Sequence, residues 1–358
     1  MERTGSEAAP HARLDEELDL DRLAHWLNER LGLRLDGAGL VVSRFRGGHS
    51  NRTYGVMANA GRWVLRLPPT GAVAQGAHDV SRECRVLSAV APELPLAPRV
   101  VATEDDSAVL GAPFYLMEHL TGTIVRKDFP KEHAPSEAER GDYANALLDG
   151  LVAVHATPTG SPALRAIGKH EGYTQRQLEG WHERYRHSQT RELPKAEAAL
   201  RWLDAHLPRE DGDCLLHNDF KFDNVVFAEG SARLIGVLDW ELATRGHPLM
   251  DLGTFLAAWV EPSDPVPLQL MRLGPTNLPG MPTRRALAER YGTLTRRDVS
   301  AYRAFYVFGL MKLGVVAQQL YFRYTRGETR DPRLAALEYG IPALFDFCEA
   351  QVRAAEEA

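Results

Sequence analysis

The chain has 358 residues, enough for two domains, and its 44% hydrophobic and 25% charged residues are typical of a soluble globular protein. A formal net charge of -6 and an isoelectric point near 6.1 argue against nucleic acid or an anionic membrane surface as a partner. The three cysteines, Cys84, Cys214 and Cys348, are far apart and give neither a disulfide framework nor metal-type spacing. That cysteine usage is typical of a reducing compartment, so we expect a cytoplasmic protein.

The first third of the sequence predicts an antiparallel sheet with one inserted helix. Residues 1–17 are polar and acid-rich, so we expect a disordered tail that is neither a signal nor a transit peptide. Residues 18–32 have the leucine spacing of a helix that is closed by Gly32. A second helix is predicted at 77–91. Strand-like runs are predicted at 40–47, 53–61, 62–69, 99–105, 108–113 and 114–120.

The remainder of the chain predicts a helical domain with a few strands inside it. Short strands are expected within 214–227 and 232–243. The most apolar helical run, 305–322, is interrupted by Lys312 and by Gln318 and Gln319, so we do not expect a membrane span. Helices are predicted at 139–156, 174–188, 195–207, 300–325 and 331–358. The predicted fold class is α+β, with a hinge near 117–122 between a strand-rich and a helix-rich lobe.

A polar cluster between two apolar runs carries the chemistry. In the stretch CLLHNDFKFDNVVF, His217, Asp219 and Asn224 follow the pattern H-x-D-x-x-x-x-N. A second hydrophobic strand then leads to Asp239, within VLDWE. Their joint spacing between apolar strands favours a catalytic loop followed by a metal-binding residue over a capped turn with surface acids.

This order of motifs resembles the protein-kinase-like fold. HNDFKFDN followed by VLDWELAT and GHPLMDLG is similar to the aminoglycoside phosphotransferase-like family. The match is closest to the kinase domains fused to acyl-CoA dehydrogenases and to their stand-alone bacterial relatives. FRGGHSNRTY, WVLRLPP, SRECRVL and FYLMEHLTG match that branch in the same order, so the resemblance spans residues 20–350. It implies a bilobal fold, with an N-lobe at 18–118 built on an antiparallel sheet plus one helix, and a mostly helical C-lobe at 119–358.

The resemblance implies ATP and Mg²⁺ as cofactors and assigns the catalytic residues. Asp219 is expected to orient the acceptor hydroxyl and take its proton, while Lys221 contacts the transferring γ-phosphate. Asn224 and Asp239 are expected to supply oxygen ligands to Mg²⁺. His217 is expected to brace the loop, and Asp251 to tie a following helix to the loop backbone. The family usually has an acidic residue where this chain has His247, a departure that affects the expected loop geometry.

On the nucleotide side, Arg66 stands where kinases usually carry a strand lysine, and Glu83 on the next helix is its expected partner. The segment GGHSN lacks the G-x-G-x-x-G pattern, yet Gly48, Ser50 and Asn51 are candidate phosphate contacts. An ordinary hairpin turn explains that segment nearly as well. The remaining cofactor-binding candidates lie in the hinge, where Glu118 and Leu120 offer backbone groups to adenine and Met117 lies behind the base.

The sequence favours a small-molecule O-kinase and leaves its acceptor open. A protein kinase would need a long activation segment, for which the dozen residues between Asp239 and Asp251 leave no room. A non-catalytic nucleotide-binding module and a true aminoglycoside kinase are the alternatives. Between Asp264 and Arg330 there are eleven Lys or Arg and four Asp or Glu, a surplus that argues against a polycationic acceptor. We therefore hypothesise an anionic hydroxyacyl acceptor, with solvated helix faces as the competing explanation of the surplus.

Overall fold

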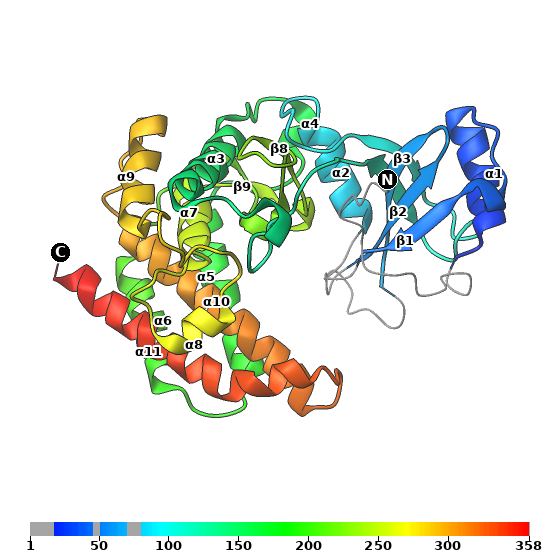
Figure 1. The fold of residues 1–358 in the computed structure, drawn as a ribbon. Helices are drawn as coiled ribbons and strands as arrows, with labels where there is room; N and C mark the ends of the chain where they lie inside the picture. The colour runs from blue at the N-terminus through cyan, green and yellow to red at the C-terminus, as the bar shows by residue number, and fades with distance from the viewer. Residues whose placement is uncertain (1–17, 46–50, 70–79, 358) are drawn as a thin grey trace. The chain divides into compact units, whose positions relative to one another are not determined.

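The computed structural model describes residues 18–45, 51–69 and 80–357 (Figure 1). It divides into two compact units. The first contains the chain up to Leu120 together with Asp239–Glu241, and the second contains Thr121–Leu238 and Leu242–Ala358. The predicted tail at 1–17 lies outside the described residues, as do Gly48 and Ser50.

The first unit is built on a five-stranded antiparallel sheet of strand order β1-β2-β3-β5-β4, with helix α2 inserted after the third strand. Along its middle strands, Val64 pairs with Gly55 on one side and with Met117 on the other. The strands are β1 (Val41–Arg44), β2 (Arg52–Ala58), β3 (Gly61–Leu67), β4 (Val100–Glu104) and β5 (Phe114–Glu118). Helices α1 (Leu20–Leu31) and α2 (Val80–Val90) complete the unit. The antiparallel sheet with one inserted helix, predicted from the sequence, is confirmed.

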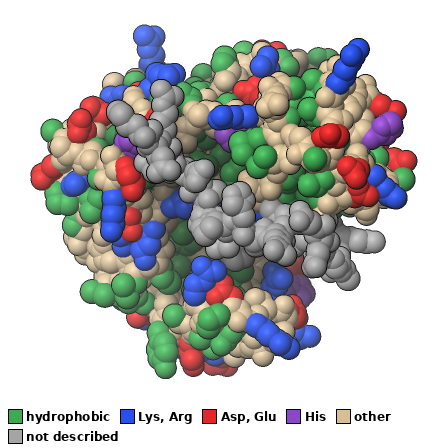
Figure 2. All heavy atoms as spheres, turned by 45° about the vertical axis from the view of Figure 1, so that its right-hand side comes forward, with side chains coloured by type: hydrophobic (Ala, Val, Ile, Leu, Met, Phe, Trp, Pro, Cys, Tyr) green, Lys and Arg blue, Asp and Glu red, His purple; other side chains and the backbone are tan. Residues whose placement is uncertain are grey.

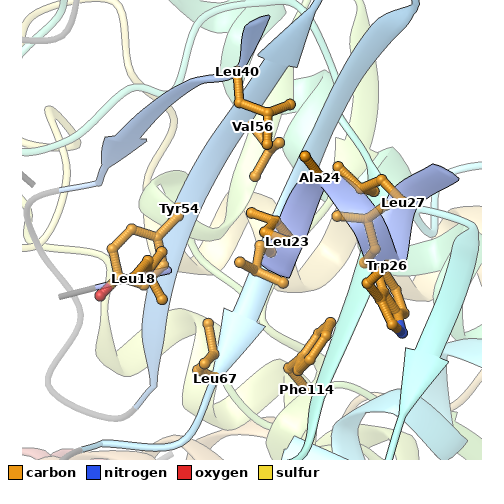
Figure 3. Packing of buried hydrophobic residues seen from close by; sticks show 12 residues of the cluster. Leu18, Leu23, Ala24, Trp26, Leu27, Leu40, Tyr54, Val56, Leu67 and Phe114 are labelled. Atoms are coloured by element: carbon orange, nitrogen blue, oxygen red, sulfur yellow. The ribbon is translucent and has the colours of Figure 1, made fainter. Parts of the chain in front are cut away.

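Helix α1 starts and ends where the sequence predicts. The Asp19 side chain accepts a hydrogen bond from the Arg22 amide at 3.0 Å, and Gly32 closes the helix at φ 66°. Its buried face, which includes Leu23 and Trp26, packs with Tyr54, Val56 and Phe114 in one hydrophobic cluster (Figure 3). The sheet thereby gains a covered apolar face, which is the main source of its stability.

Glu104 fixes helix α1 to strand β4. The Asp106 amide, Arg30 and the indole of Trp26 all donate hydrogen bonds to its carboxylate, the last at 2.7 Å. These donors favour the ionised form and lower the pKa of Glu104 to about 2.

One predicted strand is wrong. Residues 108–113 form turns and bends instead of a strand. The Asp106 carboxylate accepts the Ala108 amide at 2.8 Å, and Gly111, at φ 79°, donates its amide to the Ser107 carbonyl. A left-handed glycine and an Asp-capped turn override the short apolar run, because both reverse the chain before a ladder can form.

The second unit is mainly helical and holds two short β-ribbons. Its helices are α3 (Glu137–Ala156), α4 (Pro162–Arg165), α5 (Tyr173–Ser188), α6 (Pro194–His206), α7 (Pro248–Ala257), α8 (Val266–Met271), α9 (Arg284–Thr295), α10 (Tyr302–Thr325) and α11 (Leu337–Glu356). Strand β6 (Cys214–Leu216) pairs with β9 (Thr244–Gly246), and β7 (Val225–Phe227) pairs with β8 (Leu234–Val237). The predicted strands within 214–227 and 232–243 are therefore present, whereas β9 was not predicted.

Helix α10 is the centre of the second unit, where it packs against α7, α11, α5 and α6 (Figure 1). Its contact with α7 is close, since a side chain at Gly253 would overlap the backbone carbonyl of Phe305. Among the described residues, α10 is the one helix whose length and composition would let it cross a membrane, and 61% of that apolar stretch is buried inside the fold.

Candidate active site

Residues 217–224 connect β6 to β7 and form the predicted catalytic loop. Asn218 has the left-handed φ of 66°, a conformation that costs a non-glycine residue about 1–2 kcal/mol. Asp251 stabilises this geometry from the first turn of α7. Its two carboxylate oxygens accept the amide of His217 at 2.6 Å and that of Asn218 at 2.7 Å. The helix is thus tied to the loop backbone, as expected from the sequence.

Asp251 is fully buried, and its carboxylate is in contact with the imidazole ring of His155. Burial would raise the pKa of Asp251, but His155, whose Nε2 lies 3.3 Å away, and the His217 amide outweigh burial, so the pKa is lowered. The Nδ1 atom of His155 lies 2.7 Å from the hydroxyl of Tyr291 on α9. A buried polar chain therefore runs from α9 to the catalytic loop.

The side chains of Asp219, Lys221 and Asn224 meet within this loop. The Lys221 ammonium lies 2.5 Å from Oδ2 of Asp219 and 3.8 Å from Asp223. Nδ2 of Asn224 donates to the backbone carbonyl and to Oδ2 of Asp219, each at 2.8 Å. Asp219 keeps 31% of its side chain exposed, whereas Asn224 is buried. The Asp219 carboxylate is thus accessible, and its orientation is fixed by two neighbours.

His217 braces the loop through both ring nitrogens. Nδ1 accepts the Asp219 amide at 3.3 Å, so Nε2 carries the proton and donates to the Leu238 carbonyl at 2.8 Å. The Leu238 amide in turn donates to the Asn224 carbonyl at 2.8 Å. Leu238 directly precedes Asp239 in the chain. The two motifs found in the sequence are therefore linked by backbone hydrogen bonds through Leu238.

In the first unit, Arg66 and Glu83 form the predicted ion pair. The guanidinium Nε and Nη2 donate to Oε2 of Glu83 at 3.1 and 2.8 Å, and Nη2 also reaches Oε1 at 2.9 Å. Nη2 lies 3.3 Å from Oδ1 of Asp239. Burial alone would lower the pKa of Arg66. Glu83, Tyr115 and Asp239 raise this pKa by more than burial lowers it, so the pKa lies above its usual value and the guanidinium stays charged.

Asp239 has φ 65°, the second left-handed non-glycine residue at a motif position. Backbone strain of this kind is maintained only where the surrounding contacts fix it, and it is concentrated at functional sites. The Arg82 guanidinium donates to the carbonyl of Glu241, and Asn51 Nδ2 lies 3.4 Å from Oε2 of Glu241. These contacts attach Asp239–Glu241 to the first unit.

The other residues expected to bind the nucleotide differ in their burial and in their contacts. Asn51 is buried and its amide lies 3.4 Å from Glu83, so it supports the ion pair. Met117 is buried on β5. The Glu118 amide donates to the Arg99 carbonyl at 2.9 Å, so this amide is already engaged within the first unit. Leu120, the last residue of the first unit before the chain crosses to Thr121, is partly exposed.

Asn224 and Asp239 each offer an oxygen atom of the kind that binds Mg²⁺. Because Nδ2 of Asn224 is committed to Asp219, the atom of the carboxamide left as a ligand is Oδ1. Asp239 contributes a carboxylate that is 35% exposed, with one oxygen near Arg66. Oxygen ligands of this kind are those that Mg²⁺ prefers, with water and phosphate oxygens completing its shell. Asn224 belongs to the second unit and Asp239 to the first.

His247, which stands where the family usually has an acidic residue, caps helix α7. Its Nδ1 accepts the Leu249 amide at 3.3 Å, and its ring stacks on Phe305 with centroids 5.0 Å apart. An acidic side chain at this position would cap the helix in the same way. The departure thus preserves the start of the helix that carries Asp251.

Sequence reasoning missed the residues that surround Asn218. Its side chain donates to the Leu242 carbonyl at 2.9 Å and accepts from the Tyr173 hydroxyl at 2.9 Å. Its carbonyl accepts from the ammonium of Lys312 at 2.5 Å. A lone lysine in the apolar run 305–322 was the available signal, since an unexplained charge in a buried helix needs a partner.

Comparisons with known proteins identify the family to which the chain belongs. Residues 41–289 match the model of the phosphotransferase enzyme family. Acyl-CoA dehydrogenase family member 11 of Mus musculus is 34% identical over 322 residues, which cover 87% of this chain and 40% of that protein. Member 10 of the same species is 30% identical over 309 residues, covering 86% of this chain and 29% of that protein. The chain thus spans less than half of these relatives.

Solved structures show the same fold. A Ralstonia eutropha protein assigned to the aminoglycoside phosphotransferases is 25% identical, with a TM-score of 0.78 and coverage of 94% of this chain and 99% of that one. The ternary complex of a thermostable mutant of aminoglycoside phosphotransferase APH(4)-Ia with AMP-PNP and hygromycin B has a TM-score of 0.58 at 17% identity, covering 92% and 98%. The fold is kinase-like and α+β. The chain belongs to the phosphotransferase enzyme family.

Proposed function

We propose that the chain is a Mg²⁺- and ATP-dependent kinase that transfers the γ-phosphoryl group to a hydroxyl of a small molecule. The observation that carries the proposal is the accessible Asp219 carboxylate, oriented by Lys221 and Asn224 in a loop that Asp251 fixes. Phosphoryl transfer depends mainly on positioning and charge neutralisation, and this loop supplies both. Membership of the phosphotransferase family and the AMP-PNP held by the APH(4)-Ia structure support the use of ATP.

In this proposal each residue has one task. Asp219 accepts the proton of the acceptor hydroxyl as its oxygen bonds to phosphorus, and ADP leaves with the electrons of the broken P–O bond. Lys221 exchanges its contact with Asp219 for an oxygen of the transferring group. Arg66, held by Glu83, binds the phosphates of the nucleotide. Asn224 and Asp239 hold Mg²⁺, which when bound offsets phosphate charge.

The positive surplus between Asp264 and Arg330 is partly neutralised. Six of its arginines pair with carboxylates: Arg272 with Asp128, Arg284 with Asp264 and Glu261, Arg285 with Glu289, Arg290 with Asp149, and both Arg323 and Arg326 with Glu328. Acidic and basic side chains are also interspersed over the face shown in Figure 2. The charge count alone therefore gives weak support to an anionic acceptor. The carboxylates that pair with these arginines are likewise not free to bind a polycationic acceptor.

A small apolar hollow beside Lys221 has a volume of about 10 Å³, room for about one water molecule. Phe222, Phe255 and Trp259 provide its aromatic wall, and Gly274 also lines it. This volume is too small to enclose an acyl chain or a sugar, so the hollow does not identify the acceptor. The likeness to acyl-CoA dehydrogenase family members 10 and 11 supports a hydroxyacyl thioester of coenzyme A as the acceptor.

A matched pair of thioesters tests the acceptor. Hydroxyacyl-CoA and the same acyl-CoA without its hydroxyl would each be incubated with the protein, ATP and Mg²⁺, and phosphorylated product measured by mass spectrometry. We expect product from the first only, and none from kanamycin or choline. Product from kanamycin but from no thioester would retain the kinase and overturn the proposed acceptor. Absence of product from every acceptor, with ATP binding intact, would favour a nucleotide-binding module.

A further inference from the structure

Lys312 lies in the middle of helix α10, where its neighbours Leu310, Met311 and Val315 are buried apolar residues. Its ammonium donates to the backbone carbonyl of Asn218 at 2.5 Å. The indole ring of Trp181 on α5 lies 5.9 Å from Nζ. A methionine or leucine would fill this position at lower desolvation cost, so the charge requires a reason beyond packing.

The carbonyl that Lys312 binds belongs to the peptide group that joins Asn218 to Asp219. The other end of that peptide group, the Asp219 amide, donates to Nδ1 of His217 at 3.3 Å. Lys312 and His217 thus hold the two ends of one rigid plane. Because that plane sets the direction in which the Asp219 side chain leaves the backbone, rotating it would move the carboxylate.

The preceding residue is fixed on its remaining sides. The Asn218 amide is held by Asp251, and its side chain is held by Tyr173 and by the Leu242 carbonyl. Lys312 donates to the carbonyl of Asn218, whereas Asp251 accepts from the amide of Asn218. The left-handed backbone at φ 66° therefore has a partner for each of its polar groups.

We propose that Lys312 is a positioning residue for the catalytic base, because its ammonium donates to the Asn218 carbonyl and thereby fixes the Asn218–Asp219 peptide group. This inference rests on the proposed kinase function. Through Lys312, helix α10 helps to orient Asp219, a contribution that the sequence motif of the loop does not contain.

The charged groups around Lys312 come from the loop, from α7 and from α5. Burial lowers the pKa of Lys312, Asp219 in the loop and Asp251 on α7 raise it, and Lys221 in the loop and Arg184 on α5 lower it. The result is a pKa below the usual value for lysine. Alkaline pH should therefore remove this charge before it removes that of an exposed lysine.

Three variants test the proposal. Lys312→Met keeps the length and removes the charge, Lys312→Arg keeps the charge, and Arg323→Met removes a charge from the exposed end of the same helix as a control. With Mg²⁺, ATP and hydroxyacyl-CoA, we expect Lys312→Met to lower kcat about 10- to 100-fold, the loss of one charge-assisted hydrogen bond. The KM for ATP and the melting temperature should change little. Lys312→Arg should recover most of kcat and extend activity to higher pH, since arginine does not titrate there.

Amide hydrogen exchange of the peptide containing residues 214–224 gives a second readout that needs no activity. Exchange should accelerate in Lys312→Met and match the wild type in Lys312→Arg and Arg323→Met. An unchanged kcat together with unchanged exchange in Lys312→Met would overturn the inference. A raised KM for the acceptor at unchanged kcat would overturn it too, in favour of acceptor binding by Lys312. If the wild type itself transfers no phosphate, the proposed function fails, and exchange alone decides whether Lys312 holds the loop.

Discussion

Nδ2 of Asn224 donates hydrogen bonds to both the backbone carbonyl and Oδ2 of Asp219, each at 2.8 Å. This relationship links the expected metal ligand to the expected base. The carboxamide cannot rotate without losing both hydrogen bonds, one to a backbone carbonyl and one to a carboxylate, so Oδ1 of Asn224 has one preferred direction. Base and ligand are thus positioned as one unit of the loop.

Removal of the base should abolish turnover and leave the fold intact. We expect Asp219→Asn to lower kcat by about 10²- to 10⁴-fold, the usual contribution of a general base, with ATP affinity little changed. Asp223→Asn is a matched control, because Asp223 lies in the same loop with 29% of its side chain exposed, against 31% for Asp219. Steady-state kinetics and isothermal titration with an ATP analogue would measure both. Equal losses in the two variants would contradict the assignment of Asp219.

Asp251 should stabilise the fold in a pH-dependent manner. Asp251→Asn leaves one buried amide of the loop without its acceptor and removes the partner of His155, so we expect a loss of about 3–5 kcal/mol. The pKa of Asp251 is lowered in the folded state, so its stabilisation is present above the unfolded-state pKa, about 3.9, and is lost as the pH falls below it.

Urea unfolding from pH 7 to pH 3 measures this dependence. The difference in unfolding free energy between wild type and Asp251→Asn should be constant near neutrality and should narrow below about pH 4. A difference that widens in acid would contradict the lowered pKa.

Arg66 and Glu83 should be strongly coupled. Arg66→Met leaves a buried carboxylate without its partner, so we expect a loss of about 3–5 kcal/mol, whereas Arg66→Met with Glu83→Met should be less destabilised than Arg66→Met alone. A double-mutant cycle on unfolding free energy measures the coupling. ATP affinity should fall in both variants by about 10- to 100-fold, because the guanidinium contact to phosphate is lost in each. Additive stabilities would contradict the pairing seen in the structure.

Two glycine variants test the packing beneath the loop. Gly253→Ala would press a methyl group against the Phe305 carbonyl, so we expect a loss of about 1–3 kcal/mol. In Gly141→Ala the new methyl group would meet the Gly280 carbonyl at an ordinary 3.6 Å, so we expect a gain of up to about 1 kcal/mol from helix propensity. Thermal unfolding compares them. Equal effects would contradict the close contact of α7 with α10.

The fold was largely predictable because its elements have local signals. Helix α1 carries an Asp cap, a leucine stripe and a terminal glycine, and the sheet strands have clear turns between them. The run 108–113 was mispredicted because a single left-handed glycine outweighs a short apolar pattern. Strand β9 was missed because its three residues have no period of their own and form a strand only through pairing with β6.

The site was predictable where its residues lie close in sequence or belong to a motif of the family that the chain resembles. Asp219, Lys221 and Asn224 are within six positions, so their spacing identifies the loop. Lys312 is 94 residues from the carbonyl that it binds, and spacing cannot reveal such a contact. The charge count between Asp264 and Arg330 has the same limit. Arg290, for example, is paired with Asp149, 141 positions away, and a local charge count cannot include that partner.

The most direct test of the account is ³¹P NMR of the protein with ATP, Mg²⁺ and hydroxyacyl-CoA. The account predicts that the γ-phosphate resonance declines while ADP and a phosphomonoester appear together, and that Asp219→Asn shows neither at the same protein concentration. Inorganic phosphate as the only product, or a phosphomonoester formed equally by Asp219→Asn, would contradict the claim that Asp219 directs phosphoryl transfer to a hydroxyl acceptor.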